Sequence, residues 1–90
     1  MKVRANIKYA GHVHGVGFRF TARSVAAHYD MTGYVKNIPD GTVEVVSEGE
    51  RKTIESFFAD LGSRMSYYIR EADIEWSSAS GEFKAFDVCF

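Results

Sequence analysis

The fold is decided by residues 2–29, which read KVRANIKYAGHVHGVGFRFTARSVAAHY. The first part alternates polar and apolar residues, which predicts a strand with one buried face; the apolar members are Val3, Ala5, Ile7 and Tyr9. Closely spaced glycines from Gly11 to Gly17 then predict a loop. A helix is predicted next, with Gly33 as the stop signal beyond its end and an apolar stripe of Phe18, Ala22, Val25, Ala26 and Tyr29. A glycine-rich loop therefore leads from a strand into a helix N-terminus.

The middle of the chain predicts a hairpin followed by a second helix. Residues 34–38 and 42–47 are rich in strand-forming side chains, and Pro39-Asp40-Gly41 between them is typical of a tight turn. The second helical pattern ends at Gly62, which we interpret as its stop, and its apolar stripe is Ile54, Phe57, Phe58 and Leu61. The order so far is strand, helix, strand, strand, helix.

The last part of the chain completes the predicted fold. A strand is expected over about residues 69–76, and Phe86 and Val88 indicate a further short strand after the Ser80-Gly81 turn. The aromatic residues that fall on apolar stripes, and are therefore assigned to the core, are Phe57, Phe58 and Trp76. We expect a single domain over residues 1–90 of the α+β class, a ferredoxin-like split βαβ sandwich (βαββαβ) with two helices on one face of a mostly antiparallel sheet.

Composition and charge narrow the function classes. The 90 residues are 46% hydrophobic and 26% charged, the balance of a folded globular protein. The formal net charge of −1 provides no general attraction to nucleic acid or to an anionic membrane surface, so neither is expected as a partner. Any anion site must be local.

The N-terminal segment and the cysteine content indicate a cytoplasmic protein. Residues 1–9 alternate polar and apolar side chains, unlike a signal peptide or a membrane span. Cys89 is the only cysteine, which rules out an intrachain disulfide and suits a reducing compartment. We interpret Cys89 as a small apolar side chain and expect the protein to be a monomer.

The glycine-rich loop is suited to binding phosphate. Backbone N–H groups of such a loop can converge on one anion near the positive end of the helix dipole. Arg19 stands where the loop meets the helix and offers a planar pair of donors to phosphate oxygens. A P-loop is excluded because no Gly-Lys-Ser/Thr follows Gly17, and the order of glycines does not match a dinucleotide site. A solvated arginine remains the alternative reading of Arg19.

Two motifs of the chain resemble the signatures of the acylphosphatase family. Residues 11–19, GHVHGVGFR, satisfy every specified position of the first: glycine, any, valine, glutamine or histidine, glycine, valine, any, phenylalanine or methionine, arginine. The second is matched by residues 33–37, GYVKN, followed at the expected intervals by Gly41, Val43 and Gly49. The resemblance extends over nearly the whole chain, through residues 74–76 and the closing segments 81–83 and 86–88.

This resemblance implies a metal-independent enzyme without a cofactor that hydrolyses acyl phosphates. It implies Arg19 and Asn37 as the catalytic residues, with Asn37 orienting water, and a phosphate-binding segment formed by His14, Gly15, Val16, Gly17, Phe18 and Arg19. Inorganic phosphate or sulfate is then expected to compete with the substrate. The leaving group is a carboxylate, whose conjugate acid has a pKa of about 4, so no protein acid is needed to protonate it. From the residues alone, without this resemblance, a turn-capping asparagine is the preferred interpretation of Asn37.

Three other interpretations remain. His12 and His14 suggest a metal or a general base, but two loop histidines are too few ligands, and we expect them to shape the loop. An RNA-binding module of the RRM type shares the topology, and residues 15–20 weakly resemble its glycine-aromatic motif, although that motif belongs on a central strand. The third is a non-catalytic domain that binds acyl or carbamoyl phosphates within a larger assembly.

Overall fold

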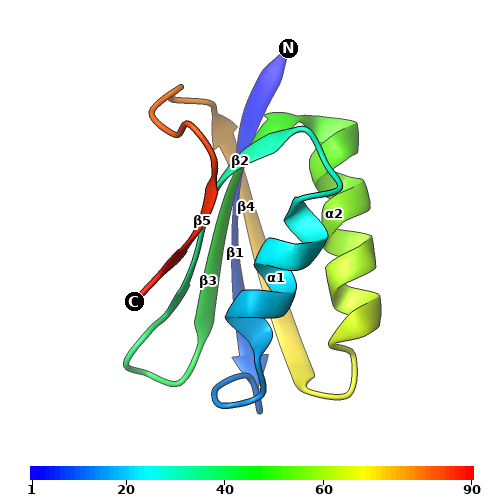
Figure 1. Ribbon diagram of the computed structural model, residues 1–90, viewed down its shortest axis with the longest axis vertical. Coiled ribbons are helices and arrows are strands. Elements are labelled where there is room, and N and C mark those ends of the chain that lie inside the picture. The colour runs from blue at the N-terminus through cyan, green and yellow to red at the C-terminus, as the bar shows by residue number, and fades with distance from the viewer.

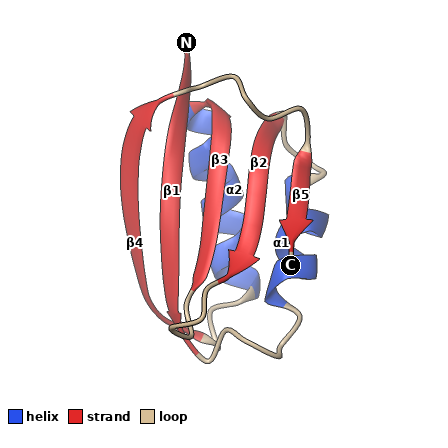
Figure 2. Ribbon diagram, turned by 90° about the vertical axis from the view of Figure 1, so that its left-hand side faces the viewer, coloured by secondary structure: helices blue, strands red, loops and turns tan.

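The computed structural model describes residues 1–90 and contains one sheet and two helices. In chain order the elements are β1 (Lys2–Gly11), α1 (Phe18–Ala26), β2 (Met31–Asn37), β3 (Val43–Glu50), α2 (Arg51–Arg64), β4 (Ile69–Ser78) and β5 (Phe86–Cys89). The strand order is β4-β1-β3-β2-β5, antiparallel except that β5 runs parallel to β2. Both helices lie on one face of the sheet (Figure 1), and Figure 2 shows the open face with the helices behind it. The predicted ferredoxin-like fold, including its short last strand, is confirmed.

The core lies between the sheet and the helices, where the predicted apolar stripes meet. Ala5, Ile7 and Tyr9 of β1 are buried, as the alternation predicted. Phe57 is fully buried and Phe58 nearly so, whereas Trp76 is half-buried, with the Arg51 guanidinium 4.2 Å from its ring centroid. Each fully buried large side chain stabilises the fold by about 1.5–3 kcal/mol. Neither helix combines the length and apolar character needed to cross a membrane.

The two glycines predicted to end the helices lie inside a strand and a helix instead. Helix α1 ends at Ala26, and Gly33 lies inside β2 with a φ of 144°. A Cβ at Gly33 would clash with the Val46 carbonyl oxygen of β3, so close backbone approach requires glycine there. Gly62 lies inside α2, which continues to Arg64. Both helix-stop predictions are therefore wrong: close approach of β3 requires the glycine at position 33, whereas a Cβ at Gly62 would meet nothing within 4 Å.

A buried carboxylate fastens the loop between β4 and β5. Glu48 of β3 is only 4% exposed; its Oε2 accepts hydrogen bonds from Ser80 N (3.0 Å) and Ser80 Oγ (2.9 Å), and its Oε1 accepts one from Gly81 N (2.9 Å). Arg4 Nη1 lies 3.4 Å from Oε2. Burial opposes ionisation of Glu48, but these donors and Arg4 together hold the pKa of its carboxyl below the ordinary value of 4.5. These contacts direct the segment after β4 back toward β2, with which β5 then pairs.

Replacing Glu48 with glutamine is expected to lower the free energy of unfolding by about 1–3 kcal/mol at pH 7, because buried donors lose a charged acceptor. A lowered folded-state pKa favours the ionised form, so this stabilisation is complete above pH 4.5 and is lost as the pH falls through the folded-state pKa. Urea unfolding of wild type and variant should therefore converge in acid. Glu71→Gln, an exposed glutamate of β4, is the control. A difference that stays constant from pH 7 into acid would contradict this account.

Candidate active site

A cavity of about 230 Å³ lies where the loop after β1 enters α1. Its lining residues are Val13, Gly15, Gly17, Phe18, Arg19, Phe20 and Asn37. Five of the residues predicted for the site therefore meet in one cavity, with Asn37 arriving from the end of β2. The predicted members His14 and Val16 do not line it.

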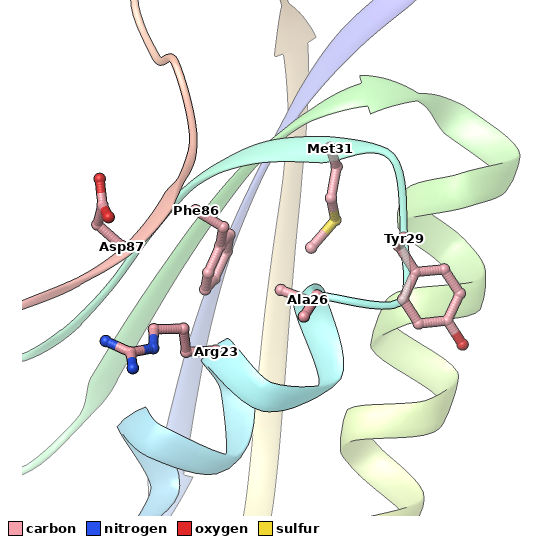
Figure 3. A pocket seen from close by; sticks show the side chains of 7 residues that line it. Arg23, Ala26, Tyr29, Met31, Phe86 and Asp87 are labelled. Atoms are coloured by element: carbon pink, nitrogen blue, oxygen red, sulfur yellow. The ribbon is translucent and has the colours of Figure 1, made fainter.

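A larger hollow of about 370 Å³ lies against the other end of α1 and is less suited to an anion. Figure 3 shows it with the side chains of Ala26, Met31 and Phe86 around it and the charged ends of Arg23 and Asp87 on one side. The Asp87 carboxylate would repel phosphate. The smaller cavity has no carboxylate among its lining residues.

The loop presents its backbone donors without protein partners. None of the N–H groups of residues 13–17 donates a hydrogen bond within the protein. Gly15 and Gly17 have φ values of 73° and 76°, a left-handed conformation that other residues adopt with strain. Gly17 is the N-cap of α1, which has no side-chain cap and no acidic residue in its first turn. These features leave the start of α1 free to bind an anion.

Arg19 is half-buried and has no carboxylate partner. Its Nη1 donates a hydrogen bond to the Cys89 carbonyl oxygen at 3.3 Å, and its guanidinium carbon lies 4.8 Å from the Phe90 ring centroid. None of the ion pairs of the protein includes Arg19. The preceding Phe18 is buried, with its ring centroid 5.0 Å from that of Tyr9, and anchors the start of the helix. The positive charge beside the cavity is thus held in place and not neutralised.

Asn37 carries an unsatisfied acceptor. Its Oδ1 is buried and receives no hydrogen bond from the protein. Leaving a buried acceptor unpaired costs about 1–3 kcal/mol, so a hydrogen-bond donor that reaches Oδ1 would stabilise this side chain. The adjoining turn is capped instead by Asp40, whose Oδ1 accepts hydrogen bonds from Thr42 N (2.9 Å) and Thr42 Oγ (2.6 Å). These hydrogen bonds hold the pKa of Asp40 below its usual range.

His14 braces the loop against the β2–β3 turn. Its Nε2 donates to the Thr42 carbonyl oxygen at 2.8 Å, and the same oxygen accepts the Ile38 N–H at 2.9 Å. The loop and the segment next to Asn37 are therefore tied to one acceptor. His12 is exposed, and no cluster of three or more His, Cys, Asp or Glu side chains is arranged to hold a metal ion.

Two aromatic residues at the cavity, Phe20 and Phe90, were not predicted from the sequence. Phe20 lines it, and Phe90 lies against both Arg19 and Phe20. Phe20 is a large apolar residue outside the apolar stripe of α1, and this position could have identified it in the sequence as a residue with a role outside the core. The contact of Phe90 joins distant parts of the chain and has no local sequence signature.

The fold and the cavity together define a ferredoxin-like α+β protein whose glycine-rich loop leads into α1 beside a cavity. The family model for acylphosphatase matches residues 5–88. The acylphosphatase of Roseiflexus sp. (strain RS-1) is 37% identical over 86 residues, which cover 94% of this chain and 92% of that protein. The chain therefore belongs to the acylphosphatase family and is an enzyme of that class.

Solved structures agree with this assignment. The crystal structure of acylphosphatase from Bacillus subtilis has a TM-score of 0.89 at 26% identity and covers 98% of this chain and 99% of that one. Full-length HypF in its phosphate- and nucleotide-bound form has a TM-score of 0.86 at 27% identity, and the match covers 100% of this chain but 12% of HypF. The fold of this chain thus resembles both a protein that the match covers almost completely and one part of a much longer chain.

Proposed function

We propose that the chain hydrolyses acyl phosphates by in-line attack of a water that Asn37 orients on a phosphate held by Arg19 and the loop. The observation that carries the proposal is that one cavity is lined by an arginine without a carboxylate partner and by an asparagine whose amide oxygen receives no hydrogen bond from the protein. The Asn37 amide oxygen accepts a hydrogen bond from the attacking water, and backbone N–H groups of residues 14–18 surround the phosphate.

The reaction needs positioning and charge stabilisation more than proton donation. The water oxygen forms a bond to phosphorus while the bond from phosphorus to the acyl oxygen breaks, and that electron pair leaves with the carboxylate. An acyl phosphate dianion and one water thereby give one carboxylate and one dihydrogen phosphate, which takes both water protons. Arg19 and the loop amides stabilise the charge on the phosphoryl oxygens throughout.

The proposal predicts hydrolysis of benzoyl phosphate at a rate that EDTA does not change, because Arg19 and backbone amides do the work that metal ions do in other phosphatases. Alkyl phosphate monoesters should be poor substrates, since their alkoxide leaving group needs a protein acid. Phosphate release from both substrate classes, measured with and without EDTA, checks this. Loss of activity in EDTA that a divalent ion restores would refute metal independence, and similar rates on both classes would reveal a general acid.

The two alternative functions have less support. The motif that suggested RNA binding lies in the loop and the first turn of α1, not on a central strand. A domain that only binds acyl or carbamoyl phosphates within a longer protein is suggested by the HypF match, but the chain spans 92% of the Roseiflexus relative. Absence of turnover in a chain that still binds phosphate would favour that reading.

We also propose a monomer that works in the cytoplasm. Edge strand β4 carries charged side chains at Arg70, Glu71, Asp73 and Glu75, and edge strand β5 spans only Phe86–Cys89. Charged and short edge strands discourage pairing between sheets of different molecules. The lone thiol of Cys89 is compatible with a reducing compartment.

A further inference from the structure

Two exposed aromatic rings stand together beside the cavity. Phe20 is 54% exposed and Phe90 is 86% exposed, and their ring centroids are 6.2 Å apart with an interplanar angle of 51°. Phe20 lines the cavity, and the Phe90 ring also lies over the Arg19 guanidinium. The chain therefore places two exposed aromatic rings next to the glycine-rich loop, at a point where two distant segments converge.

The proposed substrate has the same two-part character. Its phosphate suits Arg19 and the loop amides, while its acyl group is separated from phosphorus by a single oxygen and must lie close by. The other apolar side chains of the cavity, Val13 and Phe18, are each only 1% exposed and belong to the core. Phe20 is the apolar lining residue with surface left for a ligand, and the Phe90 ring extends that surface.

We propose that the Phe20–Phe90 pair is an acyl-group subsite that favours acyl phosphates of aromatic carboxylic acids over acetyl phosphate. Aromatic rings prefer offset or edge-to-face contact with another ring, so a benzoyl group gains more here than a methyl group does. The inference rests on the proposed function, because it assigns the acyl end of a substrate whose phosphate lies at Arg19.

The test is the ratio of kcat/KM for benzoyl phosphate to kcat/KM for acetyl phosphate. Phe20→Ala is expected to lower this ratio by about 3- to 10-fold, the range for loss of one aromatic contact. Phe20→Leu keeps apolar bulk without a ring and should also lower it, which keeps the test valid if the alanine variant unfolds. Tyr67→Ala removes a ring that is 91% exposed and lies outside the cavity, and it should leave the ratio unchanged.

The possible results separate the two proposals. A wild-type ratio retained in folded Phe20→Ala and Phe20→Leu would overturn the subsite while leaving acyl phosphate hydrolysis intact. The same loss in Tyr67→Ala would also overturn the subsite, because the effect would not depend on the cavity. A wild-type protein that hydrolyses neither compound would overturn the proposed function and the subsite together.

Discussion

Replacing Arg19 with glutamine is expected to lower kcat/KM for an acyl phosphate by about 10³- to 10⁵-fold, the range known for arginines that stabilise a transferred phosphoryl group. Arg19 has no carboxylate partner, and its guanidinium is held by the Cys89 carbonyl and the Phe90 ring. Its charge is therefore available to the phosphate in the ground state and in the transition state, so binding and turnover should fall together.

Phosphate binding gives a second readout for this variant. A ligand present at 100 times its Kd adds about 2.7 kcal/mol to the folded state, so phosphate or sulfate should raise the Tm of the wild type and inhibit it competitively. Arg19→Gln should lose both effects. Arg23→Gln, farther along α1 and outside the cavity, is the matched control and should keep them. A full phosphate-dependent rise in Tm in Arg19→Gln would place the anion site elsewhere.

Asn37→Ala is expected to lower kcat by about 10²- to 10³-fold, the typical cost of removing one transition-state hydrogen bond. The inhibition constant for phosphate should stay nearly unchanged, because the proposed contact of Asn37 is with the attacking water. Steady-state kinetics and phosphate inhibition, measured on the same sample, distinguish this pattern from the combined loss expected for Arg19→Gln.

Asp40→Ala separates catalysis from turn stability. Asp40 caps the turn next to Asn37 through Thr42, so this variant should lose about 1 kcal/mol of stability while kcat stays near normal. The opposite assignment, in which Asn37 serves only the turn, predicts near-normal kcat in folded Asn37→Ala. That result would remove Asn37 from the mechanism and leave Arg19 and the loop.

The sequence predicted those features that depend on local pattern. The alternation in β1 and the stripe beginning at Phe18 located the first strand and helix, and the intervening glycines located the loop. Gly33 was misread because its role depends on the approach of Val46 from another strand. Ile74 lies in the strand predicted over residues 69–76 and is 43% exposed, because β4 is an edge strand.

In the candidate site, too, the features that depend on local sequence were predicted and those that depend on tertiary packing were not. Arg19 and Asn37 were singled out from two motifs, and the structure puts both at one cavity. The hydrogen bond from His14 to Thr42 and the contacts of Arg19 with Cys89 and Phe90 depend on how distant segments pack. No periodicity or spacing carries that information, so only the three-dimensional structure shows the aromatic surface beside the loop.

We expect the parallel pairing of β5 with β2 to complete the site late in folding. Lys36 pairs with Cys89, whose carbonyl oxygen accepts the hydrogen bond of Arg19. Contacts between such distant segments carry a high loop-closure cost and slow the search for the native topology. In a partly folded chain with β1, α1 and the β2–β3 hairpin already formed, Arg19 would still lack its hydrogen bond to Cys89. Recovery of enzymatic activity during refolding should therefore lag behind the return of the helical circular-dichroism signal and follow the docking of β5.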